Sequence, residues 1–316
     1  MPELELMDRL DQAIDALSAG TALPAGDPEL QPLIRIAAEL RTLPDEKFQQ
    51  RLKSDLQRRA KMPVSTAAPV QEGLHTVTPL LAVSNAPELI EFLKATFDAE
   101  ETSRHPHSQG GFVASLRIRD SDVLVMSEES VPGRQRFGAF HVFVPDCDAT
   151  YARAIAAGGT SMGEPADRPY GERSGFVKDS AGNSWYIATR LGDPVYIEGL
   201  RTVVPYLHPS KAHAFIDFAK RAFNAEQLAV YEQGGRVMHA AVRIGDSVLE
   251  MGEAEPQPCS FYLSVDDCDA WYQRAIAAGA TSLWPPTDQP YGERTAGVLD
   301  PFGFQWMPAT AIKNAR

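Results

Sequence analysis

The spacing of hydrophobic residues changes repeatedly along the chain, and each change marks an expected strand or helix. Residues 77–83 are mostly apolar and predict a strand, whereas 87–97 has apolar residues at helical spacing and predicts a helix. Segments 111–118 and 123–126 alternate like paired strands and are joined by the polar link 119–122. The pattern therefore predicts a unit of one strand, one helix and then several strands.

A second unit of the same kind follows. Residues 139–144 predict a strand, after which Asp148 is placed to cap a helix over 149–157. Gly158 is expected to end this helix, because glycine readily adopts the positive φ found after helix ends. Two further strands, separated by a turn at 179–182, complete the unit.

An internal repeat organises most of the chain. Residues 147–149 return at 268–270, and 170–173 return at 291–294, both with an offset of 121. The 43-residue segments that begin at Cys147 and Cys268 are identical at 25 positions, a density that chance does not produce. The chain therefore contains two copies of one ancestral segment, and the second copy is expected to repeat the two units of the first.

The offset between the copies is larger upstream of this segment. Residues 78–80 align with 204–206 at an offset of 126, so the first copy is five residues longer between Ile118 and Ala139. This extra length is consistent with a longer hairpin around 128–137.

The N-terminal part of the chain lies outside the repeat. Apolar residues at helical spacing predict three short amphipathic helices, and the Pro, Ser, Thr and Ala of 61–73 suit a flexible tether. We therefore expect a helical N-terminal segment with its tether over 1–66 and repeat domains over 74–191 and 197–312. Short helices need a surface to cover their apolar side, so a protein partner for them is one expectation.

Composition and charge narrow the functional classes. The 316 residues carry 30 Lys and Arg against 42 Asp and Glu, a net charge of −12 that disfavours nucleic-acid binding. No stretch approaches the length of a membrane span, and the N-terminus lacks a basic and apolar leader, so a cytoplasmic location without membrane contact is expected. The three cysteines contain no C-x-x-C pair and are expected to be reduced, structural thiols.

The second copy carries a series of short motifs in a fixed order. They are 204–207, 239–247, 265–269, 274–279, and the run 291–294 leading into 300–303 and Trp306. This order resembles the glyoxalase, bleomycin-resistance and extradiol-dioxygenase superfamily, also called the vicinal oxygen chelate family, and within it the PhnB-like branch. The resemblance implies an α+β fold of tandem domains, each built of two βαβββ modules whose curled mixed sheets enclose a cavity.

Metal enzymes of this family place His, Gln or Glu on the first strand of each module and on the strand that ends it. The resemblance implies that the corresponding positions of this sequence are Thr78, Val125, Ala139 and Tyr186 in the first copy and Val204, Glu250, Ser260 and Met307 in the second. Only Glu250 is a metal-ligand type, and one carboxylate cannot hold a divalent ion, so no metal and no other cofactor are expected. His141 and His239 lie near these places, but each is expected to need its side chain on the other face of the sheet.

The same eight places are expected to line a ligand-binding cavity. Tyr206 and the loop residues Tyr170, Arg173, Tyr291 and Arg294 are expected to join them. An Arg at the mouth can bind a carboxylate or phosphate with two parallel hydrogen bonds. Alternatively, each Arg pairs with the Glu that precedes it in the motif.

Glu250 and His239 are the candidate catalytic residues. Glu250 shares a strand face with Val248, and a carboxylate buried there needs a partner, either an Arg, a ligand donor or a structural ion pair. His239 lies on a strand, where a satisfied structural role is the simpler interpretation. Six aromatic residues suit either a ligand surface or the core: Trp185, Tyr186, Tyr206, Phe261, Tyr262 and Trp306.

The resemblance and the missing metal ligands favour one function over two others. The first hypothesis is a metal-independent protein that sequesters or senses a small hydrophobic or aromatic molecule, as a monomer or a homodimer. The alternative is a metal-dependent lyase, isomerase or dioxygenase that uses Glu250. A second alternative is a regulatory scaffold that acts through the N-terminal helices.

Overall fold

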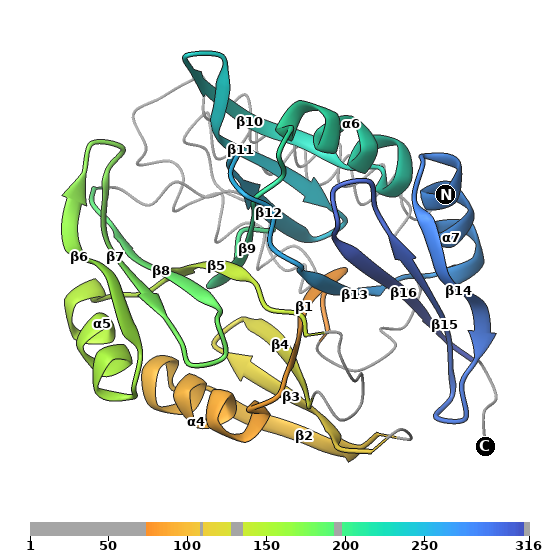
Figure 1. Cartoon of the computed structure of the whole chain (residues 1–316), viewed down its shortest axis with the longest axis horizontal. Helices are drawn as coiled ribbons and strands as arrows, with labels where there is room; N and C mark the ends of the chain where they lie inside the picture. The colour runs from red at the N-terminus through yellow and green to blue at the C-terminus, as the bar shows by residue number, and fades with distance from the viewer. Residues whose placement is uncertain (1–73, 108–109, 128–134, 193–197, 313–316) are drawn as a thin grey trace, which may run out of the picture. The chain divides into compact units, whose positions relative to one another are not determined.

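The computed structural model describes residues 74–107, 110–127, 135–192 and 198–312. The N-terminal helices and tether expected over 1–66 lie outside these residues. The described part contains four βαβββ modules in sequence order, two in each copy of the repeat (Figure 1).

Each module begins with a strand and a helix and continues with three more strands. The modules of the first copy are β1 (Val77–Val83), α4 (Ala86–Phe97), β2 (Glu100–Pro106), β3 (Phe112–Ile118) and β4 (Ser121–Ser127), and then β5 (Ala139–Phe143), α5 (Cys147–Ala156), β6 (Thr160–Arg168), β7 (Glu172–Lys178) and β8 (Ser184–Arg190). Those of the second copy are β9 (Val203–Leu207), α6 (Ala212–Phe223), β10 (Glu226–Gln233), β11 (Arg236–Ile244) and β12 (Ser247–Met251), and then β13 (Ser260–Ser264), α7 (Cys268–Ala277), β14 (Thr281–Asp288), β15 (Glu293–Leu299) and β16 (Gln305–Ala311).

The sheets join modules from different copies. One eight-stranded sheet has the order β14-β15-β16-β13-β1-β4-β3-β2, and the other has the order β10-β11-β12-β9-β5-β8-β7-β6. The first strands of two modules meet antiparallel at each centre, β1 with β13 and β5 with β9. The first module therefore shares a sheet with the fourth, and the second shares a sheet with the third.

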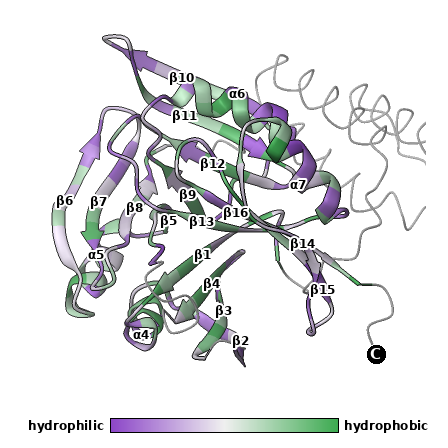
Figure 2. Cartoon of the chain, turned by 45° about the vertical axis from the view of Figure 1, so that its right-hand side comes forward, coloured by the Kyte–Doolittle hydropathy of each residue, from purple (hydrophilic) through white to green (hydrophobic). Residues whose placement is uncertain are grey.

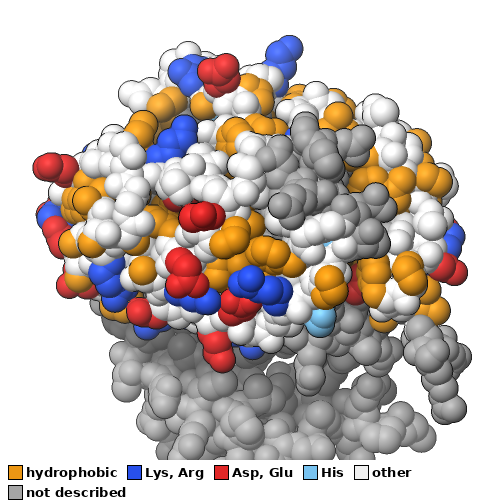
Figure 3. All heavy atoms as spheres, turned by 60° about the horizontal axis from the view of Figure 1, so that its bottom comes forward, with side chains coloured by type: hydrophobic (Ala, Val, Ile, Leu, Met, Phe, Trp, Pro, Cys, Tyr) orange, Lys and Arg blue, Asp and Glu red, His pale blue; other side chains and the backbone are white. Residues whose placement is uncertain are grey.

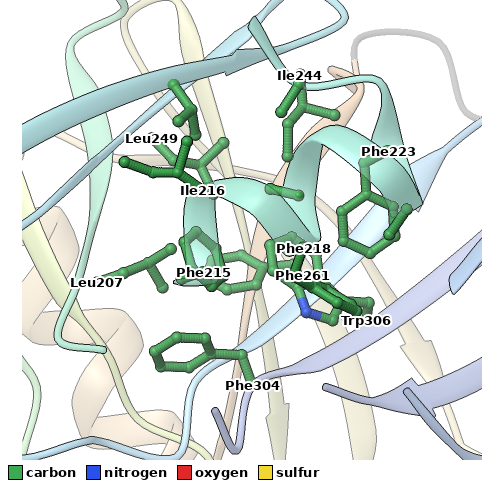
Figure 4. Close-up of a cluster of buried hydrophobic side chains, with 14 of the residues drawn as sticks. Leu207, Phe215, Ile216, Phe218, Phe223, Ile244, Leu249, Phe261, Phe304 and Trp306 are labelled. Carbon is green, nitrogen blue, oxygen red and sulfur yellow. The ribbon is translucent and has the colours of Figure 1, made fainter. Parts of the chain in front are cut away.

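The hydrophobic cores, in contrast, follow the copies. One cluster of buried side chains is drawn mainly from the helices and strands of the first copy, around Trp185, and the other is drawn mainly from the second copy, around Trp306. Figure 4 shows the second cluster, in which Phe215, Phe218 and Phe223 of α6 gather with other buried rings. Each copy is thus a packing unit, and the two sheets tie the copies together.

A reciprocal set of hydrogen bonds also links the copies. At the start of β12, the side chains of Asp246 and Ser247 accept hydrogen bonds from the backbone N–H groups of Thr76 and Val77, at 2.8 and 3.0 Å. The equivalent residues of the first copy make the equivalent bonds: Asp120 and Ser121 accept from the N–H groups of Thr202 and Val203, at 2.8 and 2.9 Å. We call these four bonds the clasp.

Most expected elements are confirmed, with one correction to the helix caps. Asp148 and its equivalent Asp269 were expected to cap α5 and α7, but the capping residues are Asp146 and Asp267. Each accepts a hydrogen bond at 2.9 Å from the backbone N–H three residues later. The chain offers two acidic residues at each helix start, and the backbone conformation selects the earlier one.

The outermost strands of both sheets were not predicted individually. β2, β6, β10 and β14 are mostly exposed and polar, so their hydrophobic signal is weak (Figure 2). The strands between these outermost strands alternate apolar and polar residues, and they bury one side against the amphipathic helices. The α+β fold with mixed sheets is confirmed, whereas the curl of the sheets stays a prediction.

Two simpler expectations concern the cysteines and membrane contact. Cys147, Cys259 and Cys268 are buried free thiols, as expected. None of the helices in the described ranges is long and apolar enough to cross a membrane. On the face shown in Figure 3, acidic and basic side chains are interspersed and neither sign forms a continuous patch.

Candidate functional site

Each sheet has one face that packs on helices, and no helix of the described residues packs on its other face. Successive residues of a strand point to opposite faces, and directly paired residues point to the same face. On β5, Phe140 and Val142 belong to the core, so His141 points to the other face. We define the β9 face by Ala139, His141, Glu172, Tyr186, Val204, Tyr206, His239 and Glu250, and the β1 face by the equivalent positions Thr78, Leu80, Leu124, Ser260, Tyr262, Glu293 and Met307.

His141 lies between two carboxylates on the β9 face. Its Nδ1 is 2.8 Å from Glu250 Oε2, and its Nε2 is 3.2 Å from Glu172 Oε2. A longer contact of 3.7 Å joins His239 Nε2 to the other oxygen of Glu250. Because β5 and β7 belong to the second module and β12 to the third, this group joins the two copies.

The charges of this group stabilise one another. Burial by itself would lower the pKa of His141, but its hydrogen bonds to Glu172 and Glu250 raise that pKa to about 9. Burial would raise the pKa of Glu250, but hydrogen bonds from His141 and His239 lower that pKa to about 2. At neutral pH His141 is therefore an imidazolium ion held against ionised Glu250.

The raised pKa of His141 predicts a specific dependence of stability on pH. Its contribution is complete below the unfolded pKa of about 6.5 and is lost as pH rises through about 9. His141→Gln should remove this dependence and lower the free energy of unfolding by about 2–4 kcal/mol at pH 7, because Glu250 loses its buried partner. Chemical denaturation of both proteins between pH 6 and 9.5 measures the difference.

The matched control is His213→Gln. His213 makes an exposed ion pair with Glu232, so its replacement should change stability by less than about 1 kcal/mol and leave the pH dependence intact. An unchanged pH profile in the His141 variant would contradict the buried imidazolium.

Aromatic rings lie next to this group. Tyr206 has its ring centroid 5.3 Å from those of Tyr186 and His208 and 6.2 Å from that of His239. Burial raises the pKa of both tyrosines and lowers the pKa of His208, so these three rings are uncharged at neutral pH. In the part of the chain that the structure describes, neither tyrosine hydroxyl has a hydrogen-bond partner. The rings form a π surface with unused hydroxyl groups.

A charged residue borders this surface. The guanidinium of Arg190 lies over the Phe143 ring at 4.3 Å, and that ring is 4.3 Å from the ring of His141. Arg190 is also the strand neighbour of Glu172. The positive and negative charges of the β9 face are therefore close to balance.

The β1 face carries different side chains at the same positions. The Tyr262 hydroxyl donates a hydrogen bond to Glu293 Oε2 at 2.9 Å. These two residues occupy the positions that His141 and Glu172 occupy in the other sheet. Leu80, Leu124 and Met307 replace Tyr206, Glu250 and Tyr186. The two faces have therefore diverged although the strands that carry them are repeats.

The arginines of the repeated Tyr-Gly-Glu-Arg motif pair within their own modules. Arg173 binds Asp148 with two hydrogen bonds and Asp167 with one at 3.0 Å. Arg294 binds Asp269 and Asp288 in the same way. The alternative expectation, that each arginine pairs with the glutamate before it, is therefore wrong: the partners are aspartates and not Glu172 or Glu293. Tyr170 and Tyr291 are exposed in the adjoining turns.

The structure places the other expected site residues on the two faces. Thr78, Ser260 and Met307 lie on the β1 face, and Ala139, Tyr186, Val204, Tyr206 and Glu250 lie on the β9 face. Val125 points into the helix-packed core, and its neighbour Leu124 takes the position equivalent to Glu250. Of the six aromatic residues, Trp185, Phe261 and Trp306 are core, and Tyr186, Tyr206 and Tyr262 face the other way.

The expectation about His141 and His239 is wrong. Both were expected to point away from the candidate site, but His141 shares its face with Ala139, two residues earlier, and His239 contacts Glu250. The spacing of two along β5 was the signal that could have identified His141. Glu172 was missed as a partner because it comes from a strand that is not adjacent to β5.

Comparison with known proteins identifies the family. A sequence model of the glyoxalase/bleomycin resistance protein/dioxygenase superfamily matches residues 73–187 and 209–307. The chain belongs to this superfamily. An uncharacterized protein of Mycobacterium tuberculosis is 34% identical over 139 residues, which cover 39% of this chain and 82% of that protein. The putative glyoxylase CFP32 of Mycobacterium bovis is 24% identical over 210 residues, covering 63% and 80%.

A solved structure shows the same fold. Glyoxalase I from Zea mays superposes with a TM-score of 0.60 over 74% of this chain and 91% of its own, at 15% sequence identity. At this identity the likeness extends to the fold and not to the activity.

Glyoxalase-superfamily membership raises the question of a metal ion, and the side chains do not fit one. Among the described residues, no group of three or more His, Cys, Asp or Glu is arranged to hold a metal ion. Both ring nitrogens of His141 already face carboxylates, and burial keeps the phenols of Tyr186 and Tyr206 protonated.

Proposed function

We propose that the chain binds a flat aromatic organic molecule on the β9 face without a metal ion, as a sequestering or sensing protein. The observation that carries this proposal is the ring surface of Tyr186, Tyr206 and His208, with two tyrosine hydroxyls free for a ligand. Partly exposed rings offer a ligand stacking area at a small cost in conformational entropy. Membership of a superfamily that includes bleomycin resistance proteins supports the proposal.

The charged side chains His141, Glu172 and Glu250, which lie next to the rings, have a positioning role in this proposal. His141 and Glu172 are 3.2 Å apart although β8 lies between their strands, which supports a curled sheet around the ligand. Pairing from both sides holds His141 and Glu250 still, so the adjacent rings present a fixed surface. Within the superfamily, we infer a place in the PhnB-like branch from the order of the motifs in the second copy.

The proposal predicts binding that depends on Tyr206 and not on metal. Fused-ring compounds such as naphthalene, quinoline and acridine derivatives should include at least one that raises the melting temperature. At a hundredfold excess over Kd such a ligand stabilises the fold by about 2.7 kcal/mol. Tyr206→Ala should weaken its binding about 5-fold to 30-fold, through loss of a stacking ring. Thermal shift and fluorescence titration, with and without EDTA, measure this.

Tyr151→Ala is the matched control, because Tyr151 lies on α5 and packs against the core on the helix-covered side of the same sheet. It should leave the affinity unchanged. Loss of binding on chelation, or near-stoichiometric Ni, Zn, Mn or Fe in protein purified without a tag, would favour the metal-dependent enzyme that uses Glu250. Deleting residues 1–66 and testing partner capture addresses the scaffold hypothesis.

A further inference from the structure

His239 lies beside the ring surface of the β9 face and has one polar partner. Its Nε2 is 3.7 Å from Glu250 Oε1, and its side chain is 41% exposed. Among the described residues, Glu250 is the one polar group that contacts this imidazole. The other ring nitrogen of His239, Nδ1, is therefore not engaged by the described part of the protein.

Glu250 favours one arrangement of the protons on this imidazole. Glu250 is ionised and bound to His141 at 2.8 Å, so its oxygens can only accept hydrogen bonds. A neutral imidazole has one N–H group and one nitrogen with a lone pair. The carboxylate favours the N–H at Nε2 of His239, which leaves the lone pair at Nδ1. The same carboxylate stabilises the positive charge that His239 gains when Nδ1 accepts a proton.

A phenol hydroxyl reaches toward the strand that carries this histidine. The rings of Tyr206 and His239 have centroids 6.2 Å apart. A Cβ atom at Gly252, which follows β12, would lie 2.9 Å from the Tyr206 hydroxyl and 2.8 Å from the carbonyl oxygen of Met238. The hydroxyl of Tyr206 therefore extends from β9 past β12 to the β11 backbone, next to His239.

A second exposed ring flanks His239 on its other side. Tyr231 of β10 is the direct strand partner of His239, so it points to the same face, and it is 59% exposed. A flat molecule stacked on Tyr206 and extending toward Tyr231 passes over His239. Such a ligand has a lone pair of imidazole and a phenol hydroxyl at neighbouring positions.

We propose that the β9 face also catalyses proton transfer, with His239 as the base and the Tyr206 hydroxyl as the donor to the developing oxyanion. The reaction depends on the proposed function, because the ligand must first lie on the ring surface. Nδ1 of His239 removes a proton from carbon, and the electron pair of the C–H bond moves through the ligand to an oxygen that accepts a hydrogen bond from Tyr206. The imidazolium then returns the proton to water. The substrate class is a flat aromatic compound with an acidic C–H conjugated to oxygen.

The test uses 5-nitro-1,2-benzisoxazole, a flat compound whose ring opens when a base removes its one C–H proton next to nitrogen. The C–H electron pair forms the nitrile, the N–O bond breaks, and the oxygen leaves as the coloured 2-cyano-4-nitrophenolate. The full chain in buffer with EDTA should accelerate this reaction with saturation kinetics. Binding of 5-nitroindole, a planar analogue without the N–O bond, is measured in parallel by thermal shift.

Variants of the three residues separate catalysis from binding. His239→Gln should lower kcat about 100-fold and change KM by less than about 2-fold, because glutamine is no base at neutral pH. Tyr206→Phe keeps the ring and should lower kcat at least about 10-fold through loss of the oxyanion donor. Glu250→Gln removes the charge that stabilises the imidazolium and should lower kcat while leaving KM and the affinity for 5-nitroindole nearly unchanged.

His213→Gln is the matched control, because His213 pairs with Glu232 in an exposed position. It should leave kcat and KM unchanged. No acceleration by the unmodified chain, an unchanged kcat in His239→Gln, or loss of activity with EDTA would overturn the proposal. If 5-nitroindole or another fused-ring compound still binds, only the proton transfer is refuted and the proposed function stands. If none binds, both fail.

Discussion

Residues 74–192 produced alone are expected to fold but to form a homodimer instead of a monomer. The first copy keeps its own hydrophobic core, around Trp185, but β1 and β5 lose β13 and β9. Since β13 repeats β5 and β9 repeats β1, a second molecule of the first copy can supply both missing strands. Unpaired central strands would otherwise leave two rows of buried backbone groups without partners. Size-exclusion chromatography with light scattering and circular dichroism measure the outcome.

Addition of the second copy provides the control. When 74–192 and 198–312 are produced together, they should co-elute as a one-to-one complex, because that pairing restores both sheets and the clasp. In the isolated first copy, Asp120→Ala should weaken the dimer, since Asp120 would then hold Thr76 of the other molecule in the way that it holds Thr202 here. A stable monomer of 74–192 with native circular dichroism would refute the cross-copy pairing.

Asp300→Ala is expected to destabilise the protein more than His141→Gln does. The buried Asp300 carboxylate accepts hydrogen bonds from the Trp306 indole N–H at 2.8 Å and from the backbone N–H groups of Phe302 and Phe304 at 2.8 and 2.9 Å. Alanine leaves two buried donors and one partly buried donor without an acceptor next to the core of the second copy. The expected loss is about 3–5 kcal/mol in the free energy of unfolding, measured by chemical denaturation.

The control for this substitution is Asp288→Ala, which removes an exposed partner of Arg294. It should cost less than about 1 kcal/mol, because Arg294 keeps Asp269 and the pair is solvated. Asp179→Ala should reproduce the effect of Asp300→Ala in the first copy, where Asp179 accepts from Trp185 at 2.9 Å. A loss of less than about 1 kcal/mol for Asp300→Ala would show that these hydrogen bonds contribute little.

Some parts of the fold could be predicted because their signals are local. The helical spacing of apolar residues located α4, and the positive φ of Gly158 and Gly279 confirms the expected helix ends. The repeated motifs revealed the duplication and the superfamily. The polar edge strands gave a weak signal, because exposed strands need no hydrophobic alternation.

The candidate site could be predicted only in part. Glu250, Tyr186 and Tyr206 were among the expected site residues, but His141 was assigned to the wrong face although it lies two residues after Ala139 on β5. Glu172 and Glu293 were considered only as partners of the adjacent arginines. Nothing in the local sequence shows that one faces an imidazole and the other a phenol, since both contacts span non-neighbouring strands.

The sequence by itself determined the duplication, the order of the helices and the inner strands, and the superfamily, because each depends on spacing along one chain. Only the tertiary structure decided which modules share a sheet. Copies with equivalent strand edges can pair within or between themselves, and the local sequence is compatible with both. That choice places His141 of the first copy beside Glu250 of the second, and Tyr262 of the second copy beside Thr78 of the first. The two faces differ in chemistry because equivalent positions carry different side chains, and the pairing between the copies decides which of these side chains meet.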